Sequence, residues 1–321
     1  MRPITLSANA AGAFYGLAAY AVFSTHDVIV KSLGATYSPI QIVFFSALLS
    51  FPLITLMLIG DRKPGTLRPV HPWWMVLRSL SGTTSAVCAF YAIAKLPLSQ
   101  VYAFIFAAPL LITIMAVPIL GETVRLRRGL AVLVGLIGVL IVLRPGASPL
   151  SDGHVAALIA AVASALSSVV VRKIGSEERR VVMIVYPIMT NLVLTAMALP
   201  FVYVELALAD LGLFSVVALL VLTAMALLVM AYGRADAIVV APTQYSQIVW
   251  ATVFGVLLFD EFPEWQTFLG IAVIILSGAY ILKREKTGDV SRTTPVLETR
   301  TRMGDSAGLR VSLIQRLWRG K

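Results

Sequence analysis

Charged residues are scarce in this 321-residue chain: only 13% of its residues are Asp, Glu, Lys or Arg. A soluble domain carries about 25% charged residues, because its surface has to face water. Here 59% of the residues are hydrophobic, and the mean hydropathy is +0.89. The composition excludes an ordinary soluble globule and predicts a protein that crosses a membrane several times.

The sequence also lacks the groups on which most enzymes and metalloproteins depend. Cys88 is the only cysteine, so no disulfide can form within the chain. Three scattered histidines and one cysteine make no metal-ligand cluster. No phosphate-binding GxxxxGKS or GxxxxGKT motif occurs, and the serine-rich patches have no base at catalytic spacing. We therefore expect no enzyme activity, no catalytic residues, no metal and no cofactor.

Apolar runs of about 20 residues, the length that crosses a bilayer as a helix, recur along the chain. They are too long for the strands of about 10 residues that build a membrane barrel. The sequence predicts an all-α polytopic membrane protein with ten transmembrane helices. These spans are expected at residues 10–30, 40–59, 73–94, 98–120, 126–143, 154–171, 181–204, 211–232, 237–259 and 265–282.

Lysine and arginine predict the orientation, because cytoplasmic loops carry an excess of both. With a cytoplasmic N-terminus, only Lys31, Lys95 and Arg144 of the 26 basic residues fall on the outer side. We expect a multi-pass protein of the inner membrane with both termini in the cytoplasm. The net charge of +10 then reflects loops beside apolar spans and a basic tail, so no nucleic-acid partner is expected.

Two stretches of the sequence carry the same landmarks in the same order. Residues 91–122, an apolar run interrupted by Pro109 and Pro118, align with residues 230–261, so that Phe106 corresponds to Tyr245 and Glu122 to Glu261. Residues 26–34 are echoed in the same way by 167–175. Each half then has five spans, and an odd number gives the halves opposite orientations. Inverted repeats are characteristic of secondary transporters, although a duplication without transport is the alternative.

Four segments resemble a known family. They are Lys31 at the end of the first span, FYAIAKLPLSQVYAFIFAAP at 90–109, GETVRLRRGLAVLVGLIGVLIVLRPG at 121–146 and APTQYSQIVWATVFGVLLFDEFP at 241–263. The chain resembles the drug/metabolite transporter (DMT) superfamily, EamA-domain group, including bacterial riboflavin transporters and S-adenosylmethionine carriers. This implies EamA-type five-helix repeats at 10–146 and 152–284, and uptake or exchange of a small metabolite without ATP hydrolysis.

His26 and Asp27 are the most conspicuous candidates for a substrate site. Ionisable groups within a span are costly and usually face a cavity or a partner. Histidine can take up a proton near neutral pH, and the adjacent carboxylate can hold the charge. The alternative is that both lie near the outer interface and reach the water there.

Further candidate substrate-binding residues are aromatic or carry an amide. Aromatic rings would suit a flat substrate, and amides would bind a polar heterocycle. Packing between helices is the alternative role for each of them. The candidates are Tyr91 in the third span, Tyr102 and Phe106 in the fourth, Asn191 in the seventh, and Gln244, Tyr245, Gln247 and Trp250 in the ninth.

The tail at 285–321 is polar and basic. Its composition predicts disorder over 287–305, and its last residues have the spacing of a short helix on the anionic inner leaflet, with an unstructured end as the alternative. We expect a secondary transporter with riboflavin as the favoured uptake substrate. The alternatives are an exporter or exchanger of amino acids or S-adenosylmethionine, and a membrane scaffold or sensor acting through its tail. A homodimer is left open.

Overall fold

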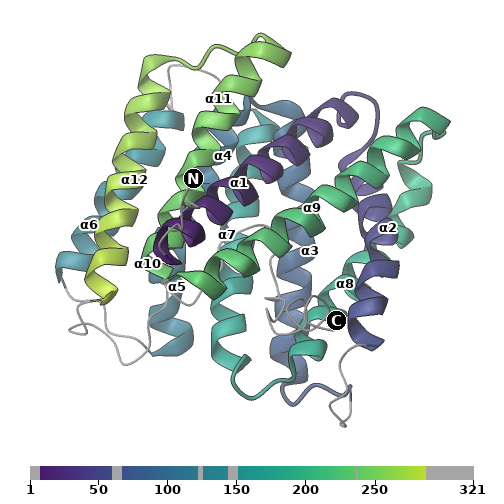
Figure 1. Cartoon of the computed structure of the whole chain (residues 1–321), viewed down its shortest axis with the longest axis horizontal. Coiled ribbons are helices and arrows are strands. Elements are labelled where there is room, and N and C mark those ends of the chain that lie inside the picture. Colours follow the sequence, from purple (N-terminus) through teal and green to yellow (C-terminus); the bar gives the residue numbers. More distant parts are fainter. Residues whose placement is uncertain (1–7, 60–66, 122–125, 144–150, 236, 287–321) are drawn as a thin grey trace, which may run out of the picture.

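A computed structural model describes residues 8–59, 67–121, 126–143, 151–235 and 237–286. Within these ranges every regular element is a helix, and the long helices cross one another in a single bundle (Figure 1). The elements are α1 (Ala8–Leu33), α2 (Pro39–Ile59), α3 (Pro72–Lys95), α4 (Leu98–Phe106), α5 (Ala108–Leu120), α6 (Leu126–Leu143), α7 (Asp152–Ile174), α8 (Arg180–Ala198), η1 (Leu199–Phe201), α9 (Leu208–Arg234), α10 (Ala237–Val240), η2 (Ala241–Tyr245), α11 (Ser246–Phe259) and α12 (Trp265–Lys286).

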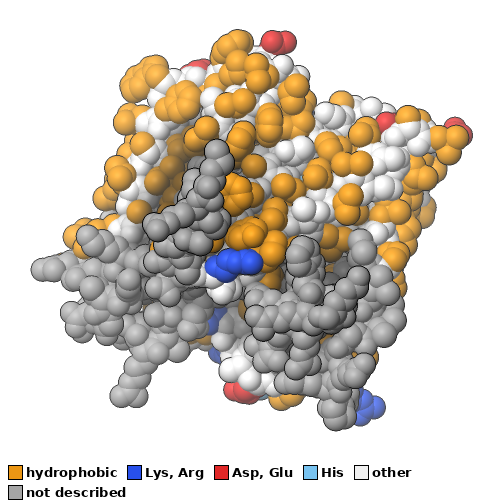
Figure 2. Space-filling view, viewed as in Figure 1, with side chains coloured by type: hydrophobic (Ala, Val, Ile, Leu, Met, Phe, Trp, Pro, Cys, Tyr) orange, Lys and Arg blue, Asp and Glu red, His pale blue; other side chains and the backbone are white. Residues whose placement is uncertain are grey.

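The outside of the bundle is apolar. Five helical segments are long and apolar enough to cross a membrane, and three shorter apolar helices accompany them. Figure 2 shows hydrophobic side chains spread over the coloured part of one face of the molecule. Exposed examples are Phe14 on α1, Leu219 on α9, Leu257 on α11 and Leu276 on α12. Such a surface fits lipid rather than water. Of the predicted tail, only residues 285 and 286 lie within the described residues.

Two of the predicted spans are broken helices. The span at 98–120 consists of α4 and α5, which meet at Ala107, two residues before Pro109. Proline has no backbone N–H and clashes with the preceding turn, so it favours a break there. Pro118, by contrast, lies inside α5 and does not end it. The span at 237–259 consists of α10, the 3-10 turn η2, which contains Pro242, and α11.

Helices from the two halves of the chain pack against each other in matched pairs. The most extensive contacts join α3 with α7, α1 with α9, and α6 with α12. A Cβ atom added to Gly12 would clash with the Cβ of Ala235, and one added to Gly153 would lie 2.8 Å from Cγ of Leu96. The alignment of 26–34 with 167–175 places Gly12 on Gly153, and the alignment of 91–122 with 230–261 places Leu96 on Ala235. Gly12 and Gly153 are therefore equivalent glycines. Each lets the start of its helix, α1 or α7, approach the end of a helix of the other half, α9 or α3.

The largest core cluster lies around α4. Seven of the nine residues of this helix are buried. Side chains from α1, α3, α7, α9, α11 and α12 join the same cluster. A central helix with so many buried positions has little contact with lipid, and its polar groups need partners inside the protein.

Candidate functional site

His26 and Asp27 lie inside the bundle together with Tyr102. His26 is 4% exposed and Asp27 is 5% exposed. Nδ1 of His26 lies 2.7 Å from Oδ1 of Asp27, and the hydroxyl of Tyr102 on α4 donates a hydrogen bond of 2.5 Å to Oδ2 of Asp27. The structure thus brings both predicted polar residues of α1 to one carboxylate-centred site. Adjacent helical residues achieve this because the imidazole turns toward its neighbour.

Aromatic rings continue from this site to the two helix breaks. Tyr102 stacks on Phe106 with ring centroids 6.0 Å apart, and Tyr245 meets Phe106 edge to face at 5.2 Å. Phe106 is the last residue of α4, and Tyr245 is the last residue of η2. The two broken spans therefore meet at corresponding residues. On the other side of the site, the ring of Phe90 lies 5.9 Å from His26.

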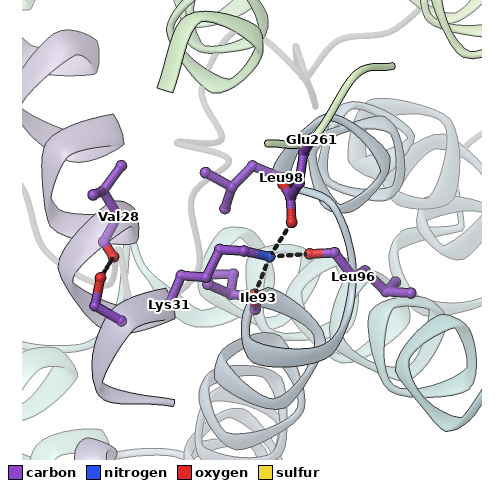
Figure 3. A network of polar contacts seen from close by, with 7 residues as sticks. Val28, Lys31, Ile93, Leu96, Leu98 and Glu261 are labelled. Atoms are coloured by element: carbon purple, nitrogen blue, oxygen red, sulfur yellow. Dashed lines mark hydrogen bonds and ion pairs between the residues drawn. The ribbon is translucent and has the colours of Figure 1, made fainter. Parts of the chain in front are cut away.

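Lys31, one turn beyond Asp27 on α1, forms a buried ion pair. Its Nζ lies 2.7 Å from Oε1 of Glu261 in the α11–α12 loop, and it donates hydrogen bonds to the carbonyl oxygens of Leu96 at 2.6 Å and Ile93 at 3.2 Å (Figure 3). Lys31 is 8% exposed. The lysine satisfies carbonyl groups at the C-terminal end of α3, where a cation is favourable to the helix dipole.

Glu261 completes this network on α4. Its Oε2 accepts a hydrogen bond of 3.1 Å from the backbone N–H of Leu98, the first residue of α4. An anion is favourable at that end of a helix dipole. Asp260, the residue before it, has a φ of 53° and ends α11 in the left-handed conformation, which Asp adopts more readily than most residues. The turn at Asp260 directs Glu261 back toward α1 and α4.

The carboxylate site and the ion pair lie side by side on the same two helices. Asp27 and Lys31 are four residues apart on α1, and Leu98 and Tyr102 are four residues apart on α4. Residues with this spacing share one helix face. One turn of each helix therefore separates the Asp27–Tyr102 contact from the Lys31–Glu261–Leu98 contact. A change at one contact can reach the other through two short, buried helix turns.

The other predicted site residues have different surroundings. Tyr91 packs against the largest core cluster. Gln247 is 1% exposed, and its Oε1 has no hydrogen-bond partner among the described residues; Gln244 is partly buried beside it in the chain. Trp250 is 36% exposed and stacks on Phe254, on the outside of α11. Asn191 lies on α8, which packs mainly on α2 and α3, away from the residues around Asp27.

For two basic residues, Lys31 and Arg78, the sequence predicts only the side of the membrane on which they lie. Lys31 was assigned to the outer loops, and its pairing with Glu261 was not predicted. Arg78 is fully buried on α3, and its Nη1 donates a hydrogen bond of 2.6 Å to the carbonyl oxygen of Met183 on α8. The available signal was position: Lys31 follows Asp27 by one turn, and Arg78 lies well inside an apolar run.

The opposite end of the bundle carries related contacts of another kind. Nζ of Lys173 on α7 donates a hydrogen bond of 2.6 Å to the carbonyl oxygen of Ile119 on α5. His71 before α3 contacts Glu177 at 2.6 Å through Nε2, and its backbone N–H donates a hydrogen bond of 2.6 Å to Oε1 of Glu178. Lys173 and Glu177 are exposed. We refer to this as the Lys173 end, and to the end with Glu261 as the Lys31 end.

A hydrogen bond at the Lys31 end corresponds to the His71–Glu178 contact. The hydroxyl of Tyr37, between α1 and α2, donates a hydrogen bond of 2.6 Å to Oδ2 of Asp210 at the start of α9. This hydrogen bond raises the pKa of Tyr37 above its ordinary value, so the phenol remains a donor across the neutral range.

Within the described residues, no group of three His, Cys, Asp or Glu side chains could hold a metal ion.

Proteins of known name are similar to this chain over most of its length. An S-adenosylmethionine uptake transporter of Rickettsia bellii is 25% identical over 263 residues, which cover 82% of this chain and 90% of the relative. The pseudopaline exporter CntI of Pseudomonas aeruginosa is 28% identical over 284 residues, covering 86% and 97% respectively. An uncharacterized transporter of Helicobacter pylori is 23% identical, covering 81% and 90%.

One solved crystal structure has the same fold. It superposes with a TM-score of 0.57 at 19% identity and covers 88% of this chain and 98% of the matched chain. The model of the EamA-like transporter family matches the chain twice, at residues 10–144 and 152–283. The two matches leave out little more than the ends of the sequence. The chain therefore belongs to the EamA-like transporter family of the DMT superfamily, a family of multi-pass membrane transporters and not of enzymes.

Proposed function

We propose that this secondary transporter moves its small metabolite between two inverted five-helix halves by alternating access. The observation that carries the proposal is the meeting of the two broken spans at Phe106 and Tyr245, which occupy corresponding positions of the two repeats. In transporters with inverted repeats, discontinuous helices commonly form the substrate site at the interface between the halves. His26, Asp27 and Tyr102 supply the polar side of that site.

The ten-span arrangement follows from the same correspondence. Each half has five spans, with α4–α5 and α10–η2–α11 each counted as one. The reciprocal contacts of Gly12 with Ala235 and of Gly153 with Leu96 support an inverted relation between the halves. In each half, the first helix begins beside the residue that follows the third long helix of the other half, Ala235 or Leu96, which we call the hinge residue. The loop charges support cytoplasmic N- and C-termini in an inner membrane. In this orientation the Lys31 end faces outward and the Lys173 end faces the cytoplasm.

Lys31 and Glu261 act as the outer gate in this proposal. The pair joins α1 of the first half to the α11–α12 loop of the second, so it has to separate before the outer side can open. Breaking a buried ion pair by loss of one partner costs about 3–5 kcal/mol, which is enough to control a conformational equilibrium. The conformation described is therefore one that is closed on the outside.

S-adenosylmethionine is the first substrate to test, ahead of riboflavin. A named relative is a transporter of S-adenosylmethionine, and the exporter CntI carries another metabolite, so direction differs among relatives. The aromatic rings beside Asp27 suit a compound with a flat base. Riboflavin, the substrate favoured by the sequence, shares the flat ring and remains in the test as a prediction.

The deciding experiment is a flux assay with the full chain in proteoliposomes. Labelled S-adenosylmethionine, riboflavin and an amino-acid mixture are offered separately, in both directions, with and without a pH gradient. We expect saturable flux of S-adenosylmethionine whose rate depends on the pH gradient, and its loss in Phe106→Ala. No saturable flux of any compound would overturn the proposal.

A membrane scaffold or sensor that acts through its basic tail predicts a different result. Removal of residues 285–321 would abolish the function of a scaffold, whereas a transporter should retain most of its flux. Residues 287–321 lie outside the described residues. The same deletion, assayed in the proteoliposomes above, separates the two functions.

A further inference from the structure

Four ionisable side chains gather near the end of α1 and leave an uneven charge. His26 contacts Asp27, and Lys31 contacts Glu261, each at 2.7 Å. The side chains of His26, Asp27 and Lys31 are at most 8% exposed, and that of Glu261 is 18% exposed. With His26 neutral, one cation and two carboxylates carry one net negative charge. With His26 protonated, the group is neutral.

The lysine of this group is committed to other partners. Nζ of Lys31 is held by Glu261 and by the carbonyl oxygens of Leu96 and Ile93, all at the end of the bundle beyond Asp27. A net charge inside a membrane bundle is costly and is normally neutralised by a partner or a ligand. The negative charge of the group can be balanced by a proton on His26 or by a cation that enters the site.

The surroundings of Asp27 favour such a cation. Tyr102, whose hydroxyl donates to Asp27, stacks on Phe106; Tyr245 contacts Phe106, and Phe90 lies against His26. The faces of aromatic rings attract ammonium and other organic cations, and the attraction is strongest where water is excluded. A carboxylate among rings therefore recognises a cationic group attached to a flat or apolar body.

We infer that Asp27 is the counter-ion for a cationic group of the substrate, an ammonium or a sulfonium, and that this cation alternates with a proton on His26. The inference rests on the proposed function, because it assigns a substrate class to the same site. It distinguishes the candidate substrates by charge: S-adenosylmethionine carries a sulfonium, whereas riboflavin is neutral.

The alternation gives a definite pH dependence. The elements around His26 carry further titratable groups besides Asp27. They are Tyr15, Tyr20 and Lys31 on α1, Arg78, Cys88, Tyr91 and Lys95 on α3, Tyr102 on α4, Asp210, Tyr232 and Arg234 on α9, Tyr245 on η2, and Glu261 in the α11–α12 loop. The tyrosines and the cysteine are uncharged at neutral pH. Binding of the cation releases one proton, so the affinity falls by up to about tenfold per pH unit as His26 becomes protonated.

Calorimetric binding to the purified full-length protein tests the inference. The probes are S-adenosylmethionine, tetramethylammonium and riboflavin, each measured from pH 5 to pH 8. We expect at least one cation to bind at pH 8 and to bind more weakly toward pH 5, with release of a proton at the acid end of this range. Asp27→Asn should weaken cation binding at least tenfold.

Asp152→Asn is the matched control, because Asp152 is an exposed carboxylate at the start of α7. It should bind the cations as the unchanged protein does. If Asp27→Asn does not fold, as judged by thermal unfolding, the pH profile and proton release of the unchanged protein decide.

The inference is overturned if neither cation binds the unchanged protein at millimolar concentration. It is also overturned if folded Asp27→Asn binds the cations equally well, or if affinity does not fall toward pH 5. Saturable flux of riboflavin together with any of these results would leave the proposed transport function intact and remove only the charge selectivity.

Discussion

The two ends of the bundle use equivalent positions, but they are closed in different ways. At the Lys31 end, Tyr37 contacts Asp210; at the Lys173 end, Glu178 contacts the backbone of His71. In the alignment of the two halves, Glu178 corresponds to Tyr37 and Asp210 corresponds to His71. The Lys31 end also has the buried Lys31–Glu261 pair. Glu122, which corresponds to Glu261, lies outside the described residues.

This difference ranks the two ends by strength. At the Lys173 end, the side chains of His71 and Glu177 are 35% and 61% exposed. Exposed ion pairs contribute about 0–1 kcal/mol, whereas a buried pair that loses one partner costs about 3–5 kcal/mol. Among the contacts of the described residues, the ion pair at the Lys31 end is therefore the stronger one.

Breaking the buried pair should have the largest effect. Lys31→Met leaves Glu261 without its cation and removes two hydrogen bonds to the end of α3. We expect a loss of about 3–5 kcal/mol in stability and at least a tenfold loss of flux. Thermal unfolding and proteoliposome flux measure both, with Lys95→Met, an exposed lysine on the same hinge, as the control that changes little.

Double variants of the pair test the role of the helix ends. Lys31→Met with Glu261→Leu removes both charges and should recover much of the stability. Lys31→Glu with Glu261→Lys restores an ion pair, but it places an anion at the C-terminal end of α3 and a cation at the N-terminal end of α4. Both charges are unfavourable to the helix dipoles, so this double variant should not recover the lost stability. Full rescue by the exchanged pair would contradict this account of the network.

The two glycine contacts should differ by a smaller amount. An alanine at position 12 meets the Cβ of Ala235 and backbone atoms of Ala231 and Ala235, which are fixed to a helix end. An alanine at position 153 meets mainly the side chain of Leu96, which can rotate. Gly12→Ala should cost about 1–3 kcal/mol, and Gly153→Ala less. Thermal unfolding of the two variants compares them directly, and a larger cost for Gly153→Ala would be the wrong order.

The Tyr37–Asp210 hydrogen bond and the corresponding contact of Glu178 with the backbone of His71 should contribute less to stability than the features above. Tyr37→Phe removes a hydrogen bond to a charged group, so it should lower the midpoint of chemical unfolding clearly. Glu178→Gln keeps an oxygen that can accept from His71, so its effect on the same midpoint should be the smaller of the two. Equal losses in chemical unfolding would show that the two contacts do not differ as their chemistry implies.

The exposed contact between His71 and Glu177 should have the smallest effect. Glu177→Gln removes a pair that salt already screens. We expect flux to change by less than twofold at physiological salt, and the stability change to stay below about 1 kcal/mol. If Glu177→Gln lowered flux and stability as much as Lys31→Met does, the two ends would be equally strong, which would contradict this account.

Much of the fold could be predicted because apolar length and charge bias act locally along the chain. The span at 98–120 and its break at Pro109 follow from such local rules. Asp27 and Tyr102 were also identifiable, since a polar group among apolar neighbours is conspicuous. The pairing of Lys31 with Glu261 was not, because it joins opposite halves of the chain through packing that no local pattern encodes.

Burial within an apolar helix was harder to predict than the helix itself. Trp250 stays a prediction for the substrate site, and its side chain is 36% exposed on α11. In a membrane protein both the lipid-facing and the inward face can be apolar, so hydrophobic spacing does not distinguish them. Arg78 is the opposite case. The charge bias of the loops places it on the cytoplasmic side, whereas its side chain is fully buried and donates a hydrogen bond to Met183 on α8.

Distances across the two ends test the central claim that they open in alternation. In a Cys88→Ser background, one spin-label pair at Ala35 and Phe262 spans the Lys31 end, and another at Ser176 and Leu126 spans the Lys173 end; all four positions are exposed. Pulsed electron resonance should give a short, narrow distance across the Lys31 end at rest. A transported substrate should lengthen that distance while shortening the other. Distances that stay fixed during transport, or that lengthen together, would contradict the account.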